Sequence, residues 1–455
     1  GLQNRLDRFD SGPRLHFFCP RKPPLSGKYG SFRTIPPENP SAELAVSTFK
    51  EYGNCKLMTS SQETAHQQKE RPTPDPYGKR IQELLDRIEE KYPPERIAAA
   101  ERKWRNLWDF NQPFSQPPAV LHRGRSIDGV MHYPIETPEE RRRLLELKLQ
   151  DILLLAEIED DYIPVLFLDA GAYILAEAFG GERIRENELY ITSPFLMTEE
   201  EIAAMPEFRP EEEHRYAQMV FETLRLFREE TAGRIPINIH TPQGPLETFG
   251  CMCDSSCFFL ALLDDPAAVM KALNKVVDGY IWYIRRQLEI LGEQARFNFA
   301  MSYTPRPSGT GIGVGDDVMA TISPECFRLT QPLYERIAGE FGGFLLHSCG
   351  NPAHQLPLIM ENRAIRGIHF SQLEAEEFMP RISRPVVVHS RNDWKDFDQL
   401  AGYARTAKQY RLRIAYQFQS LGQWMQVGDD RTRYNPGRMR EMFLRAAEII
   451  ESAQN

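Results

Sequence analysis

Short apolar runs alternate with longer amphipathic stretches along most of this chain. Eight runs predict strands, and most are apolar on both faces, as expected for parallel strands buried between layers. They are 119–122, 162–168, 235–240, 296–301, 343–347, 365–370, 385–389 and 412–418. Helical spacing predicts connecting helices at 139–158, 211–231, 266–291, 324–341 and 394–410. The alternation predicts an α/β fold, a (β/α)8 barrel of the TIM type, with an insertion after strand two and a closing helix at 439–453.

The beginning of the chain has a different character. Residues 1–78 are rich in Pro, Ser, Lys and Arg and show no sustained period, which predicts a disordered or extended N-terminal segment. Met58 is a candidate natural start, and a tail that wraps a partner subunit is the alternative. From Arg80 onward helical spacing predicts a lead-in of two helices, so we expect the barrel to occupy 79–455.

An open, doubly wound sheet is the alternative fold. That fold normally carries a phosphate-binding loop directly after its first strand. The residues after the first predicted strand read LHRGRS at 121–126, which is no such loop. The barrel is therefore the favoured fold.

Composition narrows the class of protein. The 455 residues carry a net charge of −9 and are 41% hydrophobic, which disfavours nucleic acid or an anionic membrane as the main partner. The longest dense apolar run, 258–263, is too short to span a bilayer. Seven irregularly spaced cysteines and no export signal indicate a reducing cytoplasm. We expect a cytoplasmic enzyme with a small-molecule substrate, compatible with a homodimer because barrel helices often pair subunits.

Histidines end four of the predicted strands. His240, His347, His369 and His389 each close an apolar run, and catalytic residues of such barrels lie at the C-terminal ends of strands. A single histidine at a strand end is more often structural, but four at one end favour a site. His347 and Cys349 are two residues apart, so an extended chain directs both to one side, and imidazole and thiolate suit zinc. We predict them as metal ligands.

Other polar side chains follow the strand ends. The catalytic candidates are His240, Tyr303, His369, His389 and Arg391. The substrate-binding candidates are Arg123, Gln243, Asp316, Asp317, Glu374 and Gln419. Strand eight also ends near Gln417. We expect these groups to converge at the barrel mouth.

Two motifs suggest functions that their spacing does not support. The glycine-rich segment 309–315 matches neither a dinucleotide fingerprint nor a phosphate loop, so we predict a mobile loop over the barrel mouth. Asp316 and Asp317 after it either bind a cationic group or orient a ligand, or are solvated loop acids. Cys251, Cys253 and Cys257 lack a matching distal pair and are predicted to be core cysteines in a packed helix.

Several segments occur in an order typical of a known family. They read AEAFG at 176–180, GP at 244–245, LDDP at 263–266, GDDVMATISPE at 315–325, PLYER at 332–336 and HSCGN at 347–351. Over roughly residues 95 to 450 the chain resembles the uroporphyrinogen decarboxylase superfamily. It looks most like the branch of cobalamin-dependent methyltransferases that act on thiols.

The resemblance implies a (β/α)8 barrel and a particular chemistry. In the methyltransferase branch, a His-x-Cys after strand five and a cysteine after strand eight hold zinc. The zinc activates a thiol, which takes a methyl group from a methylated corrinoid carried by a partner protein. His347 and Cys349 match the first two ligands, but 416–422 contains no cysteine. A third ligand would then come from His369, His389, Glu374 or Gln419.

Three functions follow as hypotheses. The first is a zinc-dependent methyltransferase. The second is a uroporphyrinogen decarboxylase-type decarboxylase or lyase, in which Arg123, Arg125 and Arg391 grip an acidic substrate and a histidine donates a proton. The characteristic arginine-containing loop of the decarboxylases is absent at 121–126. The third is a non-catalytic partner of a corrinoid protein.

Overall fold

The computed structural model describes residues 76–121, 133–171, 174–186, 189–212, 214–297, 305, 310–391, 394–418 and 436–454. The described residues from Pro76 onward belong to one compact unit. The predicted N-terminal segment therefore lies almost entirely outside the described residues. No helix in the part of the chain that the structure describes is long and apolar enough to cross a membrane.

Two helices lead into the barrel, as the sequence predicts. α1 (Pro76–Lys91) buries Ile81, Leu84, Leu85 and Ile88, which recur at helical spacing on one face. α2 (Pro94–Trp108) begins on a proline, whose fixed φ and missing N–H suit a first helical position. α1 packs against α3, so the lead-in covers the first βα unit.

Six parallel strands form the main sheet. Their order is β1 (Ala119–Leu121), β10 (Arg413–Phe418), β9 (Val387–His389), β8 (Ile365–Phe370), β7 (Phe344–Ser348) and β6 (Ile312–Gly315). Nearly every residue in these strands is buried, which is why their sequences read as continuous apolar runs.

A shorter pair of strands lies between the two edges of that sheet. β4 (Ile237–Asn238) pairs in parallel with β5 (Ala295–Arg296), and Leu166 bridges to Ile237. The Asp161 N–H donates to the Ala119 carbonyl at 3.0 Å, and the Gly244 N–H donates to the Gly315 carbonyl at 2.7 Å. These links join the two edge strands of the sheet, β1 and β6, through the segment 161–166 and β4. The strands therefore close on themselves, which confirms the TIM-type barrel.

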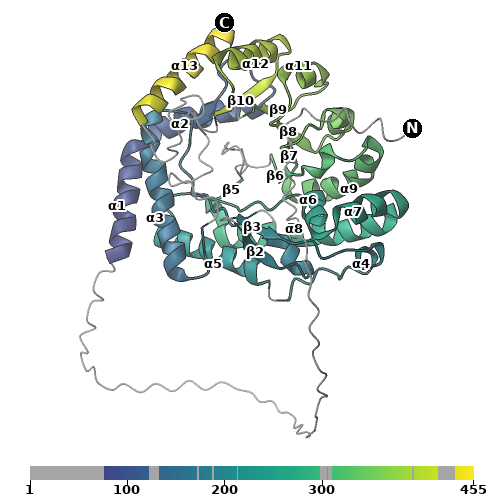
Figure 1. Ribbon diagram of the computed structural model, residues 1–455. Helices are drawn as coiled ribbons and strands as arrows, with labels where there is room; N and C mark the ends of the chain where they lie inside the picture. The colour runs from purple at the N-terminus through teal and green to yellow at the C-terminus, as the bar shows by residue number, and fades with distance from the viewer. Residues whose placement is uncertain are drawn as a thin grey trace, which may run out of the picture. The chain divides into compact units, whose positions relative to one another are not determined.

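Helices surround the strands on the outside (Figure 1). The longer helices are α3 (Pro138–Leu154), α5 (Arg215–Glu230), α8 (Pro266–Leu291), α9 (Pro324–Phe341), α12 (Phe397–Gln409) and α13 (Pro436–Gln454). The shorter ones are α4 (Glu199–Ala203), α6 (Pro245–Met252), α7 (Ser255–Asp264), α10 (Leu356–Glu361) and α11 (Ala375–Phe378). Short 3-10 segments are η2 (Ala156–Ile158), η3 (Ile174–Phe179), η4 (Gly292–Gln294), η5 (Val318–Ala320), η6 (Ala353–Gln355) and η7 (Met379–Arg381).

The insertion after strand two is a hairpin. β2 (Arg183–Glu186) and β3 (Leu189–Thr192) pair antiparallel, apart from the main sheet. The hairpin follows the segment 162–168, at the position where the sequence predicts an insertion. It therefore adds surface at the end of the barrel where the strands terminate.

Two parts of the predicted strand map need correction. The segment 309–315 is not a loop: β6 runs from Ile312 to Gly315, and its residues are all buried. The strand is hard to recognise in the sequence because its glycines have no side chain that could contribute to an apolar pattern. At Gly311 (φ +90°) a Cβ would lie 1.6 Å from the Gly343 carbonyl oxygen, so close strand approach requires glycine there.

The strand predicted at 162–168 is shorter than expected, and most of the strand predicted at 296–301 lies outside the described residues. Within 162–168 the described pairing is the Leu166 bridge, and β5 covers Ala295–Arg296. Residues 298–301 lie outside the described residues.

Candidate functional site

Three neighbouring strands carry histidines at the same level. His347 on β7 pairs with His369 on β8, which pairs with His389 on β9. Paired residues on adjacent parallel strands point to the same face, and the rings lie in a row. The centroids of His347 and His369 are 4.7 Å apart in a stacked arrangement, and those of His369 and His389 are 6.4 Å apart. All three side chains are buried.

One group of potential metal ligands lies at the end of this row. One ligand atom each from Asp317, His347 and Cys349 lie within 4.8 Å of one another, and no second such trio occurs in the described ranges. His347 Nε2 is 3.2 Å from Cys349 Sγ, and the Cys349 N–H donates to Asp317 Oδ1 at 2.5 Å. An oxygen, a nitrogen and a sulfur donor suit zinc, and three protein ligands leave a fourth position open. The trio therefore fits a catalytic type of metal site.

The surroundings of His347 favour a ligand role. Its Nδ1 lies 3.2 Å from the His369 carbonyl oxygen. That oxygen can only accept, so Nδ1 carries the proton and Nε2 presents a lone pair toward Cys349. Metal-binding histidines commonly donate their second ring N–H to a backbone carbonyl in this way. Burial lowers the pKa of His347, which also favours the neutral, ligating form.

Cys349 is an ordinary protonated thiol in the absence of a cation. Burial and the neighbouring Asp317 carboxylate raise its pKa to about 12. A bound divalent cation inverts this balance because it stabilises the thiolate directly. The Asp317 carboxylate thus disfavours a thiolate at Cys349. A bound metal ion would offset this repulsion.

The two adjacent aspartates have different surroundings. Asp316 is fully buried, and it accepts from the Glu247 N–H at 2.6 Å and from the Tyr334 hydroxyl at 2.8 Å. Burial raises its pKa well above the usual range. A Cβ at Gly244 would lie 2.1 Å from Asp316 Oδ2, so glycine is required for this packing. Asp316 therefore ties α6 and α9 to the end of β6, while Asp317 faces His347 and Cys349.

Two glutamines lie near the histidine row. Gln243 Oε1 is within 2.9 Å of the position that a Cβ would take at Gly315, and His347 Cδ2 is 3.5 Å from that position. Gln417 is fully buried, with Nε2 3.0 Å from His369 Nε2 and 2.6 Å from the Ser390 carbonyl oxygen that accepts from it. Among the described residues its Oε1 has no hydrogen-bond partner. Gln417, on β10, thereby holds the His369 ring.

Arg391 and Glu374 form a pair beyond the row. Arg391 Nη1 donates to Glu374 Oε1 at 2.9 Å, and Gln399 Nε2 donates to Glu374 Oε2 at 3.1 Å. Burial raises the pKa of Glu374, but the hydrogen bonds from Arg391 and Gln399 and the charge of Lys395 outweigh it, so the net shift is downward. Glu374 is engaged here rather than at His347, which separates it from the metal-ligand trio.

His240 lies at the end of β4 and is fixed by α8. The backbone N–H of His240 donates to Gln287 Oε1 at 2.6 Å, and Gln287 Nε2 donates to the backbone carbonyl oxygen of His240 at 2.9 Å. The Tyr283 hydroxyl is 2.9 Å from its Nδ1. Tyr283 and Gln287 are absent from the sequence-based candidates because both belong to the buried face of a long amphipathic helix, where their period resembles core packing.

Some predicted residues lie outside the described part of the chain, namely Tyr303, Arg123, Arg125 and Gln419. The cysteine cluster lies within described structure but not in one helix. Cys251 is in α6, Cys253 ends it, and Cys257 is in α7; burial raises the pKa of all three. Among the described residues they contribute no metal-ligand group.

Comparisons with known proteins find a family model and solved structures that resemble this chain. Residues 165–294 match the family model described as Uroporphyrinogen decarboxylase (URO-D). A solved methyltransferase from Methanosarcina mazei is 15% identical with a TM-score of 0.50, over 75% of this chain and 96% of that one. A B12-independent methionine synthase from Shewanella sp. W3-18-1, solved with selenomethionine, is 14% identical with a TM-score of 0.44, over 74% and 98%. No curated protein sequence matches the chain. The match to the uroporphyrinogen decarboxylase family model is thus limited to residues 165–294, and the likeness to the solved methyltransferase is one of fold.

Proposed function

We propose that this protein is a metal-assisted, methyltransferase-like enzyme that methylates a thiol. The observation that carries the proposal is the convergence of Asp317, His347 and Cys349 at the end of β6 and β7. The shared fold with a protein named as a methyltransferase supports the reaction class. Zinc is the proposed metal because the three donors are a carboxylate, an imidazole and a thiolate.

The roles of the chain's own residues follow from their contacts. Asp317, His347 and Cys349 would hold the ion, and the His369 carbonyl keeps the His347 ring turned toward Cys349. Bound zinc would supply a Lewis acid that lowers the pKa of a coordinated thiol. Gln417 holds His369, and the buried histidine row excludes water from one side of the centre. We propose a methylated corrinoid on a partner protein as the methyl donor.

Decarboxylation or lyase chemistry on an acidic substrate is the second candidate, and the name of the matching family model favours it. Arg391, expected to grip a substrate carboxylate, is 2.9 Å from Glu374. A substrate carboxylate would therefore compete with an internal one at this residue. That competition places the second candidate behind the first.

Metal content tests the first proposal. Protein purified without chelator is expected to hold close to one equivalent of zinc, and Asp317→Asn, His347→Ala and Cys349→Ser are expected to lose most of it. Cys257→Ser is the matched control, since Cys257 is another largely buried cysteine outside the trio. Less than about a tenth of an equivalent in the wild type, with no uptake of added zinc, would remove the metal from the proposal.

A further inference from the structure

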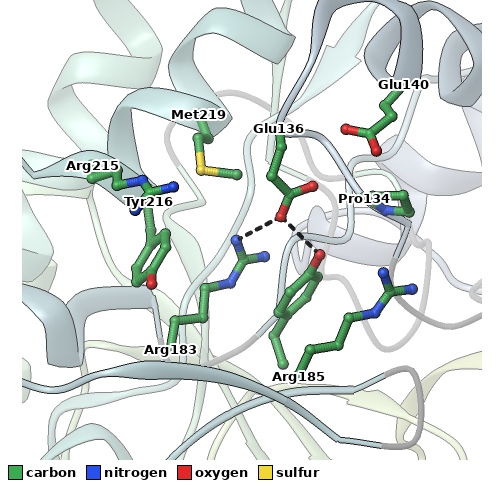
Figure 2. Close-up of a pocket in the computed structure, with 9 residues that line it drawn as sticks. Pro134, Glu136, Glu140, Arg183, Arg185, Arg215, Tyr216 and Met219 are labelled. Carbon is green, nitrogen blue, oxygen red and sulfur yellow. Dashed lines mark hydrogen bonds and ion pairs between the residues drawn. The ribbon is translucent and has the colours of Figure 1, made fainter.

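A cavity of about 390 Å³ lies apart from the metal-ligand trio. It is lined by Glu136, Glu140, Arg183, Arg185, Tyr190 and Arg215, among others, and we call it the arginine pocket (Figure 2). Glu140 lies in the first turn of α3, the arginines 183 and 185 lie on the inserted hairpin, and Arg215 begins α5. Helix starts in such barrels lie at the C-terminal ends of the strands, so the pocket lies at the catalytic end.

Arg183 is the fixed element of this pocket. Only 8% of its side chain is exposed, and its guanidinium lies 3.3 Å over the Tyr190 ring. Its Nη2 donates to the Ala170 carbonyl at 3.0 Å, while its Nη1 is 4.0 Å from Glu136 Oε1. Burial lowers the pKa of Arg183, but a guanidinium remains charged at neutral pH. The chain therefore holds a nearly buried cation in one orientation beside an open cavity.

The two acidic residues of the pocket, Glu136 and Glu140, accept hydrogen bonds from groups of the chain itself. Glu136 Oε1 accepts from the Tyr190 hydroxyl at 3.0 Å, and Glu136 Oε2 accepts from the Ile135 N–H at 2.8 Å. Glu140 Oε2 accepts from the Thr137 N–H at 2.9 Å in the capping box of α3. Figure 2 shows Glu136 above the guanidinium of Arg183, with both dashed contacts ending on its carboxylate.

The other two arginines are exposed. Within the described ranges neither Arg185 nor Arg215 forms an ion pair, although both line the cavity. The pocket thus has three guanidinium groups and two carboxylates. Both carboxylates already accept hydrogen bonds from N–H or hydroxyl groups of the chain. This excess of positive charge, beside a rigid Arg183, is the charge pattern expected where an oxyanion binds.

The charge of Arg183 acts on Tyr283, which contacts His240. Burial raises the pKa of Tyr283, and the charge of Arg183 acts in the opposite direction, which places the two groups within electrostatic range. The same tyrosine hydroxyl is 2.9 Å from His240 Nδ1.

We propose that the arginine pocket binds the oxyanion group, carboxylate or phosphate, of a small molecule. Arg183 provides the fixed guanidinium, and Arg185 and Arg215 approach the ligand from the exposed side. Planar guanidinium groups suit both anions because each can donate two parallel hydrogen bonds. The inference does not depend on the metal centre or on the reaction class.

Titration calorimetry at low ionic strength tests the proposal with two probes, inorganic phosphate and succinate. We expect at least one probe to bind, and we expect the Arg185→Ala/Arg215→Ala double variant to bind it roughly tenfold or more weakly. The probe that binds identifies the anion class. Both substitutions are at exposed positions, so circular dichroism is expected to show an unchanged fold.

Two further variants test whether anion binding is specific to the arginine pocket. Arg405→Ala removes an exposed arginine on α12 and is expected to leave binding unchanged. His347→Ala is also expected to retain binding, which distinguishes failure of the pocket from failure of the metal centre. The proposal is overturned if neither probe binds the wild type, if the double variant binds as tightly as the wild type, or if binding disappears with His347.

Discussion

The backbone of His369 orients the side chain of His347. The carbonyl oxygen of His369 lies 3.2 Å from His347 Nδ1, and the two rings stack 4.7 Å apart on neighbouring strands. The positioning group for the candidate ligand is thus a backbone atom of the adjacent strand. A side-chain substitution at His369 removes the stacked ring and leaves the carbonyl in place.

The first prediction separates these two histidines. His347→Ala is expected to weaken zinc binding by more than about 100-fold, and His369→Ala by less than about tenfold, because only the former removes a donor atom. Competition with a zinc-binding dye measures both, and His354→Ala serves as a control on η6. Equal losses at positions 347 and 369 would mean that the side chain of His369, rather than its carbonyl, supports the site.

The second prediction separates the two aspartates. Asp316→Ala leaves the Glu247 N–H and the Tyr334 hydroxyl without an acceptor in the core, so the free energy of unfolding is expected to fall by about 2–3 kcal/mol. Asp317→Asn is expected to change stability by less than about 1 kcal/mol in zinc-free protein. Denaturant unfolding of the zinc-free proteins measures both values. A reversed order would contradict the division of roles between the two residues.

The third prediction concerns metal removal. If the trio holds zinc in the folded state alone, chelation is expected to lower the melting temperature by roughly a few degrees, since a ligand that binds only the native state stabilises it. Added zinc is expected to restore the value, and magnesium is not, because a thiolate ligand disfavours a hard cation. Differential scanning calorimetry measures the shift. Cys349→Ser should show little response to either treatment.

The fourth prediction is a pH dependence from Glu374. Its folded-state pKa is lowered, so its contribution to stability is present above its unfolded value and is lost as pH falls through the folded value. Glu374→Gln is expected to remove part of the loss of stability on the acid side of pH 4.5. Denaturant midpoints from pH 7 down to about pH 3 measure this, with the exposed Glu376→Gln as control. Identical acid profiles for the wild type and Glu374→Gln would argue against the Arg391 pairing in solution.

The long helices can be predicted from the sequence because local signals coincide with packing. Pro266–Leu291 and Pro324–Phe341 each begin with a proline after a capping residue, Asp265 or Ser323, and each presents an apolar face. The structure reproduces both predicted ranges. Where caps, proline and period agree, a helix is defined without tertiary information.

The strands are predictable only where side chains carry the pattern. β6 escapes prediction because glycines occupy the positions where backbone approaches backbone, as at Gly311. In the site, the closeness of His347 and Cys349 follows from their spacing. The different surroundings of Asp316 and Asp317 do not follow from the sequence, because they depend on contacts with Tyr334 and with the start of α6.

The arginine pocket is only partly visible in the sequence. Arg183 and Arg185 are two residues apart on a strand, so they share one face of the hairpin. Arg215 lies well downstream, at the start of α5, and only the fold brings it to the same cavity.

The three candidate ligands all lie between residues 317 and 349, within the single unit β6–α9–β7. Such a centre is modular: its three donors share one βαβ segment, and the neighbouring strand β8 adds the carbonyl that orients His347. Transplanting that segment with its β8 neighbour into another barrel of the same type would carry the complete donor set. The remaining loops could then change the reaction while these three side chains stay constant.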